Sequence, residues 1–356
     1  MLNCGKYLTQ VGPIKVKSGG VICLALAHNE GRIIAEFLAY YRSFGQVSFL
    51  IVDDHSNDGS AEYLKNQPDV TLFQPVAGSS YSRHKKRWRS NLLDSFAENK
   101  WCLVPDIDEH FVFLDIEKKP LAKLIDELEQ EGSEALFSLM IDMYADKPLK
   151  DHFYQPDRKS ELRNEFPFFD GQANSPYGYR LMSLPSSFRK KYPTPRVAAY
   201  GGLRDRLFSE HKNEMNYVQK LLLRNFAHLR RPINPKGFST ITNALTRLVC
   251  KKYFSSNPYN STKLILIRWQ KGLEFSGGAH SVNKKLAISN KISAVLHYKF
   301  AGGISRLEYA SDRGQHAGGS LLIKRILDED ELLKRSPVYA FTKKYENSHS
   351  LSNLLR

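Results

Sequence analysis

The sequence contains no long hydrophobic run. Its longest uninterrupted apolar segment is VICLALA at residues 21–27, far shorter than the roughly 20 residues of a membrane-spanning helix. The N-terminus carries Lys6, Lys15 and Lys17 but lacks the apolar core and small-residue cleavage site of a secretory signal peptide. These absences predict a cytoplasmic protein.

Cysteine is scarce as well. The four cysteines, at positions 4, 23, 102 and 250, have neither the paired spacing of a zinc site nor the density of a disulfide framework. No internal repeat and no low-complexity segment occurs. Because 42% of the residues are hydrophobic and 12% are aromatic, the chain is expected to fold around a substantial core.

Acidic residues are outnumbered by basic ones, and the formal net charge is +15. The excess is concentrated in three runs: SRHKKRWR at 82–89, FRKKYPTPR at 188–196 and LLRNFAHLRR at 222–231. Nucleic acid, anionic lipid or a phosphate-bearing ligand would each suit such charge. A solvated basic surface would explain each run equally well.

From residue 20 onward, segments typical of strands and helices alternate. Apolar runs of strand length lie at 21–27, 47–54, 70–75 and 101–108, and helical spacing lies between them, most clearly at 81–99. This order predicts an α/β fold with a mixed, mostly parallel sheet and helices on both faces. Ligands of such sheets bind beyond the carboxyl ends of the strands, where the sequence places its polar clusters.

The second half of the sequence is less regular. A helix is expected at 121–132 and a strand at 135–144, followed by long ordered loops over 146–200. Strand-like pieces return as GGLRDRLF at 201–208, KLILIRW at 263–269 and SAVLHYKF at 293–300. The last fifty residues are expected to form helices and a polar tail.

An acidic cluster, VPDIDEHFVFLD at 104–115, ends the fourth predicted strand. Side chains alternate along a strand, so Asp106 and Asp108 would point the same way, and Glu109 would point away. A divalent cation such as Mg²⁺ or Mn²⁺ would relieve the repulsion between the two aspartates. The alternative is a surface strand end with solvated carboxylates.

Three segments carry a resemblance to a known family. VICLALAHNEGRIIAEFLAYYRSFG, FLIVDDHSNDGS and WCLVPDIDEHF resemble the nucleotide-sugar half of family 2-type glycosyltransferases with the GT-A (Rossmann-like) fold. A bacterial branch of that family combines a DIDE motif with later motifs similar to GGLRDRLF, KLILIRW, LHYKF and RGQH. All occur here in that order, over roughly residues 20–320.

This resemblance implies a domain organisation. Residues 1–19 would be an N-terminal leader, and 20–305 would be the GT-A catalytic domain. Within that domain, 20–115 would be the nucleotide-sugar half and 116–305 the acceptor half. Residues 306–356 would be a C-terminal helical extension.

The resemblance also implies roles for individual residues. Asp53 or Asp54 would read the nucleotide base, beside a wall formed by Ala27, His28, Asn29 and Glu30. Asp108 would bind the divalent metal, Mn²⁺ or Mg²⁺, with Asp106 behind it. A late histidine would complete the metal site, with His297 as the best match and His280 as the alternative. From the residues alone, a lone histidine such as His297 on a strand is more often a half-buried ring with a satisfied hydrogen bond.

Sugar transfer needs cations for the diphosphate and, for inversion at the sugar carbon, a base for the acceptor hydroxyl. Lys263 and Arg268 are candidate donor contacts, and Arg204 and Arg206 are candidate phosphate or acceptor contacts. Asp170 is the first choice for the base because its neighbours are aromatic and apolar. The alternatives are Asp142, Asp146, Asp205 and, beside the metal pair, Glu109.

The predicted function is therefore transfer of a sugar from a nucleotide-diphosphate sugar to a saccharide or lipid-linked hydroxyl acceptor, as in bacterial surface polysaccharide or glycolipid synthesis. The basic runs would allow peripheral contact with an anionic membrane at its inner face. One alternative is a nucleic-acid-binding protein in which Trp88 stacks on bases. Another is a metal-dependent nucleotidyltransferase, although the expected glycine-rich phosphate loop is missing.

Overall fold

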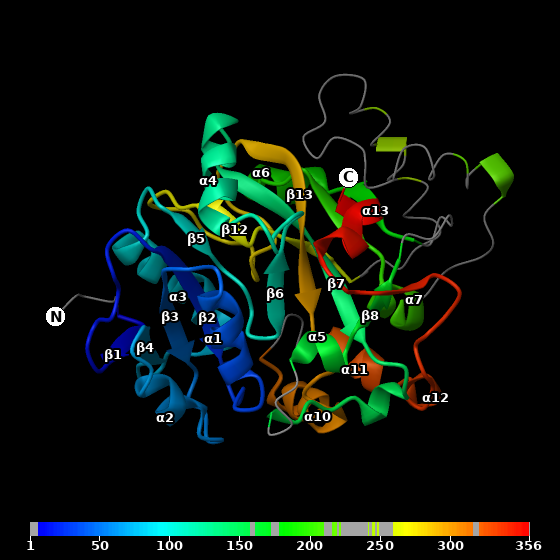
Figure 1. The fold of residues 1–356 in the computed structure, drawn as a ribbon, viewed down its shortest axis with the longest axis horizontal. Helices are drawn as coiled ribbons and strands as arrows, with labels where there is room; N and C mark the ends of the chain where they lie inside the picture. Colours follow the sequence, from blue (N-terminus) through cyan, green and yellow to red (C-terminus); the bar gives the residue numbers. More distant parts are fainter. Residues whose placement is uncertain are drawn as a thin grey trace.

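The computed structural model describes residues 6–156, 161–171, 178–209, 259–315 and 320–355, with isolated positions between 216 and 248. Within them, a twelve-stranded sheet forms the centre of the molecule (Figure 1). Nine of its strands follow one path, in the order β1 (Leu8–Val11), β4 (Val70–Pro75), β3 (Val47–Asp53), β2 (Val21–Ala27), β5 (Trp101–Leu103), β12 (Leu266–Arg268), β7 (Ala135–Tyr144), β13 (Ile288–His297) and β6 (Glu109–Val112).

The remaining strands extend this sheet or form a separate ribbon. β11 (Thr262–Lys263) and β8 (Phe168–Asp170) pair with β7, and β14 (Thr342–Lys344) pairs with β8. β9 (Arg180–Ser183) and β10 (Val197–Tyr200) form a separate antiparallel pair. The longer helices are α1 (Ile34–Arg42), α2 (Ser60–Lys65), α3 (Tyr81–Phe96), α4 (Leu121–Gln130), α6 (Ser186–Lys191), α7 (Leu203–Phe208), α10 (Ile304–Arg313) and α11 (Leu321–Leu327).

The sheet is mixed, as predicted, and its two halves differ in strand direction. β4, β3, β2 and β5 run parallel to one another, and β1 at the edge runs antiparallel to β4. Beyond β5, the strands β12 and β6 run antiparallel to theirs, while β13 runs parallel to β7. The alternating strand–helix order therefore describes the first half of the sheet, and strands from distant parts of the chain complete the second.

Helices α1 and α3 cover opposite faces of the parallel half. Phe49 and Val52 are three positions apart on β3, so their side chains point to opposite faces. Phe49 contacts Phe37 of α1, with ring centroids 6.3 Å apart. Phe73 pairs with Val52 on the other face and contacts Phe96 of α3 at 6.1 Å. The predicted layers of helix, sheet and helix are present here.

The fourth predicted strand is shorter than expected. β5 ends at Leu103, and the chain turns before β6 begins at Glu109, with the Glu109 amide donating to the carbonyl of Asp106 at 3.1 Å. Pro105, inside this stretch, has no N–H to offer a neighbouring strand. Asp106 and Asp108 therefore lie in a turn, and the expected alternation along a strand does not govern where their side chains point.

The segment GGLRDRLF is a helix and not the predicted strand. Gly202 (φ +83°) precedes α7, and the Arg206 amide donates to the Gly202 carbonyl at 2.9 Å. Leucine and arginine are good helix formers, and Leu203 and Phe208 are both buried. Consequently Arg204 and Arg206, two positions apart, do not share a face.

Both predicted terminal segments belong to the main fold. In the predicted leader, β1 pairs with β4 at the edge of the sheet. The predicted C-terminal extension does contain helices α10 and α11, together with α12 (Asp330–Leu333) and α13 (Ser352–Leu355). Its strand β14, however, pairs with β8, and α10 forms one wall of the pocket described below.

Candidate functional site

A pocket of about 670 Å³ opens beyond the carboxyl ends of β2 and β13. This volume lies within the range of small-molecule sites. We call its two poles the β2 end, formed by His28, Asn29 and Glu30, and the β13 end, formed by Asp108, His297 and Lys299. Helix α10 lines the pocket between them.

The β13 end is built on three neighbouring strands. His297, the last residue of β13, pairs with Asp142 on β7 and with Glu109 on β6. Directly paired residues point to the same face of a sheet, so these three side chains gather around one point. Asp108 joins them from the preceding turn, and the Tyr298 amide donates to its carbonyl at 2.8 Å.

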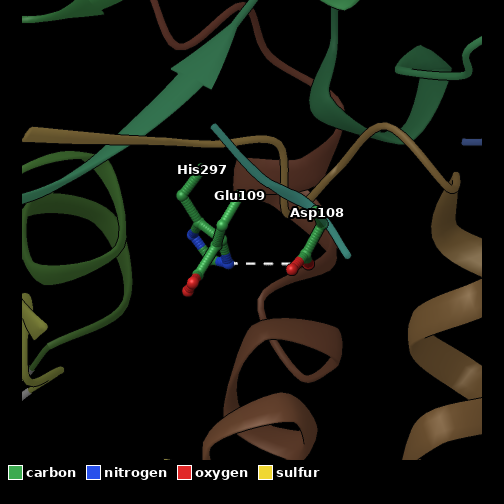
Figure 2. A group of neighbouring side chains, drawn as sticks. All are labelled: Asp108, Glu109 and His297. Atoms are coloured by element: carbon green, nitrogen blue, oxygen red, sulfur yellow. Dashed lines mark ion pairs between the residues drawn. The ribbon is translucent and has the colours of Figure 1, made fainter. Parts of the chain in front are cut away.

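The imidazole of His297 lies between two carboxylates. Its Nδ1 is 2.7 Å from Oδ1 of Asp142. Its Nε2 is 3.6 Å from Oδ2 of Asp108, and Figure 2 shows this second contact. Burial disfavours the charged imidazole, but Asp108 and then Asp142 outweigh it and raise the pKa of His297. An Nδ1–H donated to Asp142 leaves the Nε2 lone pair directed towards Asp108, which is the arrangement of a metal-binding histidine.

Two buried cations hold the other acidic side chains. Lys263 Nζ lies 2.6 Å from Asp106 and 2.8 Å from Glu109, and Arg89 lies 3.1 Å from Asp106. Burial would raise the pKa of Asp106, but Lys263 and Arg89 hold it well below its usual range. For Glu109 burial prevails, and its pKa is raised. Asp106 and Glu109 are thus already compensated by protein charges.

Asp108, Glu109 and His297 could hold a metal ion, because one ligand atom from each lies within 4.8 Å of the others. All three side chains are buried. Burial opposes ionisation of Asp108, but His297 lowers the pKa of this carboxyl well below its usual value. Asp108 therefore carries its charge throughout the physiological pH range. Because Lys263 holds Glu109, Asp108 and His297 are the more available ligands.

At the β2 end, two loops are joined by hydrogen bonds. Asn29 adopts a left-handed conformation (φ +54°), which asparagine tolerates better than most residues. Its amide donates to Ser56 Oγ at 2.9 Å, and its Oδ1 accepts from the Asn57 amide at 2.9 Å. The turn HSNDGS therefore fixes the strand end at Ala27, whose carbonyl accepts from the Asp54 amide at 2.8 Å.

Helix α10 contacts three of the predicted donor-binding residues. Arg306 forms an ion pair with Glu30, and the Tyr309 hydroxyl lies 2.7 Å from Nε2 of His28. Arg313 lies 2.5 Å from Asp54. Burial raises the pKa of Glu30 to about 8 despite Arg306. The polar groups at this end are thus paired within the protein.

Asp53 and Asp54 do not line the pocket. Asp53 is fully buried at the end of β3, where its Oδ2 accepts from the Ser56 amide at 3.2 Å and from Gln74 at 3.1 Å. Asp54 lies behind Arg313, which does line the pocket. A ligand could reach Asp54 only if Arg313 moved.

Of the candidate bases, Glu109 lines the pocket, whereas the four aspartates do not. Asp142 lies behind His297 and is held by Arg204 at 2.8 Å, so it can position the histidine. Asp170 is buried against Arg206 at 2.8 Å and accepts from the Tyr144 hydroxyl at 2.8 Å. The alternatives Asp146 and Asp205 are bound to Ser336 and Arg180, respectively.

Some of the candidate cations line the pocket, as does the second candidate histidine, and other cations lie outside it. Lys263 and Arg204 line the pocket, whereas Arg206 and the exposed Arg268 do not. His280 lines it too, with Nδ1 2.5 Å from the Thr262 carbonyl. Burial lowers the pKa of His280 to about 4, so it is neutral at physiological pH.

Among the pocket residues that the sequence did not indicate are Lys299, Arg306, Tyr309 and Arg313. Lys299 could have been considered, since it lies in the motif LHYKF two positions after His297. The other three lie at helical spacing on α10. Only the tertiary fold brings that helix to the carboxyl ends of the strands.

The basic runs differ in their environment. In SRHKKRWR, Trp88 is fully buried and donates to Ser79 at 2.8 Å, and Arg89 is buried beside Asp106. Trp88 therefore cannot stack on bases, which removes the aromatic element of the nucleic-acid alternative. The run FRKKYPTPR begins within α6 and continues beyond its end. The run LLRNFAHLRR lies outside the described residues.

Comparison with known proteins assigns no family to the chain. No protein-family model and no curated protein matches it. One solved structure is a putative glucose-1-phosphate thymidylyltransferase from Bacillus anthracis in complex with a sucrose. It aligns over 38% of this chain and 57% of its own, at 11% identity and a TM-score of 0.24. A likeness this low carries no argument about function. None of the helices in the described residues is long and apolar enough to cross a membrane.

Proposed function

We propose that the protein is a metal-dependent glycosyltransferase that uses a nucleotide-diphosphate sugar as its donor. The observation that carries this proposal is the row of Asp142, His297 and Asp108 at one end of a ligand-sized pocket. The order of motifs that resembles family 2-type glycosyltransferases supports it. In this proposal the β13 end receives the diphosphate, and the β2 end receives the nucleoside.

The donor atoms at the β13 end suit Mn²⁺ or Mg²⁺. A carboxylate oxygen is a usual ligand of either ion, and an imidazole nitrogen also suits a first-row metal such as Mn²⁺. Asp108 and His297 would hold the ion, and Asp142 would orient His297 through Nδ1. A bound divalent cation would offset negative charge on the leaving diphosphate.

The proposed reaction displaces the diphosphate from the sugar. The acceptor oxygen forms a bond to the anomeric carbon, the bond from that carbon to the phosphate oxygen breaks, and its electron pair remains on the phosphate. The acceptor's hydroxyl proton passes to a carboxylate in the pocket.

The surface around α3 and α6 is the proposed contact with an anionic membrane. The exposed side chains of Arg83 and Arg87 lie on α3, and those of Lys190 and Lys191 lie on α6. Lys86 Nζ of α3 lies 3.0 Å from the Tyr192 hydroxyl, which follows α6, so the two helices are neighbours. Retention by anionic but not by neutral vesicles at low salt would support this contact with a lipid-bearing acceptor.

The products of the reaction separate the proposal from nucleotidyl transfer. Incubation of the wild type with Mn²⁺ and a panel of nucleotide-diphosphate sugars should release a nucleoside diphosphate from one of them. The Asp108→Ala variant should release it much more slowly, because it lacks a proposed metal ligand. A nucleotidyltransferase would instead release pyrophosphate from a nucleoside triphosphate and a sugar phosphate. Release of pyrophosphate alone would contradict the proposal.

A further inference from the structure

The Lys299 side chain lines the pocket without a protein partner for its charge. It is half-buried, and within the described residues its ammonium makes no hydrogen bond, ion pair or ring contact. Its surroundings include Asp108 and Glu30 but also Arg204 and Arg306. A partly desolvated cation without a partner is costly unless an anion binds to it.

The other pocket cations differ from Lys299 in this respect. Lys263 is held by Asp106 and Glu109. Three arginines lie in ion pairs: Arg204 with Asp142, Arg306 with Glu30 and Arg313 with Asp54. Arg32 stacks on the Phe153 ring, 3.9 Å from its centroid. Among the cations that line the described part of the pocket, Lys299 and the exposed Arg32 therefore lack a carboxylate partner. Of these two, Lys299 is the half-buried one and lies two residues from His297.

The backbone on both sides of Lys299 is held in place. The Tyr298 amide donates to the Asp108 carbonyl at 2.8 Å, and the Ala301 amide donates to the Tyr298 carbonyl at 3.0 Å. Tyr298 and Phe300 are both buried. The side chain between them thus projects from a fixed point beside His297. The rigid backbone reduces the entropy that a bound ligand must remove.

We propose that Lys299 binds the diphosphate of the donor and stabilises the charge that the departing phosphate acquires. This inference rests on the proposed function and adds a residue that contacts the substrate. As the bond between the sugar carbon and the phosphate oxygen breaks, the electron pair stays on that oxygen, and the ammonium lies where this charge develops. The first turn of α10 adjoins this point, since Gly302 and Ser305 also line the pocket.

The test is the affinity for inorganic pyrophosphate in the presence of Mn²⁺, measured by calorimetry. Lys299→Met should weaken binding by about tenfold or more, the usual range for losing a charged hydrogen bond, whereas Lys299→Arg should retain most of it. Arg268→Met is the matched control, because Arg268 is exposed outside the pocket, and it should bind as wild type does. Mn²⁺ binding measured alone should not weaken in Lys299→Met.

Parallel titrations identify the source of the anion. A nucleoside diphosphate should lose affinity in Lys299→Met as pyrophosphate does, whereas the free nucleoside should lose none. A loss confined to a uronic acid, with pyrophosphate unaffected, would assign Lys299 to an anionic acceptor and overturn the inference. Should Lys299→Met fail to fold, Lys299→Gln supports the same comparison.

The outcomes for the two proposals are distinguishable. If Lys299→Met binds pyrophosphate as tightly as wild type does, the role of Lys299 is overturned and the proposed function still stands. Wild type that binds neither pyrophosphate nor any nucleoside diphosphate would overturn both.

Discussion

The two ends of the pocket present their charges to a ligand in different ways. At the β2 end, α10 already supplies a partner for His28, for Glu30 and for Asp54 behind them. At the β13 end, His297 and Asp108 face each other at 3.6 Å, and the Lys299 ammonium has no partner within the described residues. The β13 end is therefore ready for a charged ligand, whereas the β2 end must exchange internal contacts for new ones.

This difference indicates where each part of a donor gains its binding free energy. A diphosphate at the β13 end would meet unpaired positive charge in a partly desolvated place, where electrostatic attraction is strong. A nucleoside at the β2 end would gain only the difference between its own contacts and those of α10. The nucleoside should therefore contribute less to the binding free energy of the donor than the diphosphate does.

The largest expected effect of a substitution is at Asp142, which lies behind His297 at the β13 end. Asp142→Asn should lower Mn²⁺ affinity by about 10- to 100-fold, because His297 loses its orienting carboxylate. It should also lower the free energy of unfolding by about 3 kcal/mol, because the mostly buried Arg204 is left without its counterion. Calorimetry and urea unfolding measure the two effects.

The control for this change is Asp115→Asn, which alters an exposed carboxylate that pairs with His349. It should change neither quantity appreciably. An Asp142→Asn variant with wild-type Mn²⁺ affinity would remove Asp142 as the positioning residue.

Acid should destabilise the fold at a site away from both ends. His152 is fully buried, its Nε2 accepts from the Ala145 amide, and burial lowers its pKa to about 4. The folded pKa of His152 lies below the unfolded value of about 6.5, so the neutral, buried ring stabilises the fold fully above pH 6.5. As the pH falls towards 4, the free energy of unfolding should decrease by about 3 kcal/mol in total.

Urea unfolding of wild type and His152→Gln at pH 7 and pH 4.5 tests this prediction. The variant should lose less stability between the two pH values than wild type loses. An equal loss in both proteins would place the acid sensitivity elsewhere in the fold.

A smaller effect is expected at Asp170, which lies outside both ends. Asp170→Asn should lower the free energy of unfolding by about 1–3 kcal/mol, because it removes charged hydrogen bonds to Arg206. The folded variant should transfer sugar at close to the wild-type rate. Unchanged stability together with abolished transfer would restore Asp170 as the base.

The smallest effect concerns the ion pair that covers Asp54. Arg313→Ala should lower stability by only about 1 kcal/mol, since the pair is partly exposed. It should also tighten nucleoside diphosphate binding a few-fold, because the nucleotide no longer has to displace Arg313. Weaker binding in the variant would show that Arg313 itself contacts the ligand.

Local patterns predicted the first half of the fold well. The apolar runs at 21–27 and 70–75 became β2 and β4 with the same bounds, and the basic segment at 81–99 contains α3. These elements are neighbours in sequence and in space. The strand–helix order alone therefore placed His28, Asn29 and Glu30 at one edge of the sheet.

The second half depends on contacts that the sequence does not display. β6, β7 and β13 are neighbours in the sheet although more than 170 residues separate β6 from β13. The alternation rule turned Glu109 away from Asp108, but the turn after β5 brought the two together. Likewise, Asp142 and Asp170 resembled free bases in the sequence, whereas each has an arginine partner from α7.

The most direct test of the central claim is the melting temperature of wild type and Asp108→Ala, measured with a panel of nucleoside diphosphates with and without Mn²⁺. A ligand that binds only the folded state raises the melting temperature. We expect a Mn²⁺-dependent rise for at least one nucleoside diphosphate with wild type and none with Asp108→Ala. A rise that needs no metal and survives in Asp108→Ala would contradict it.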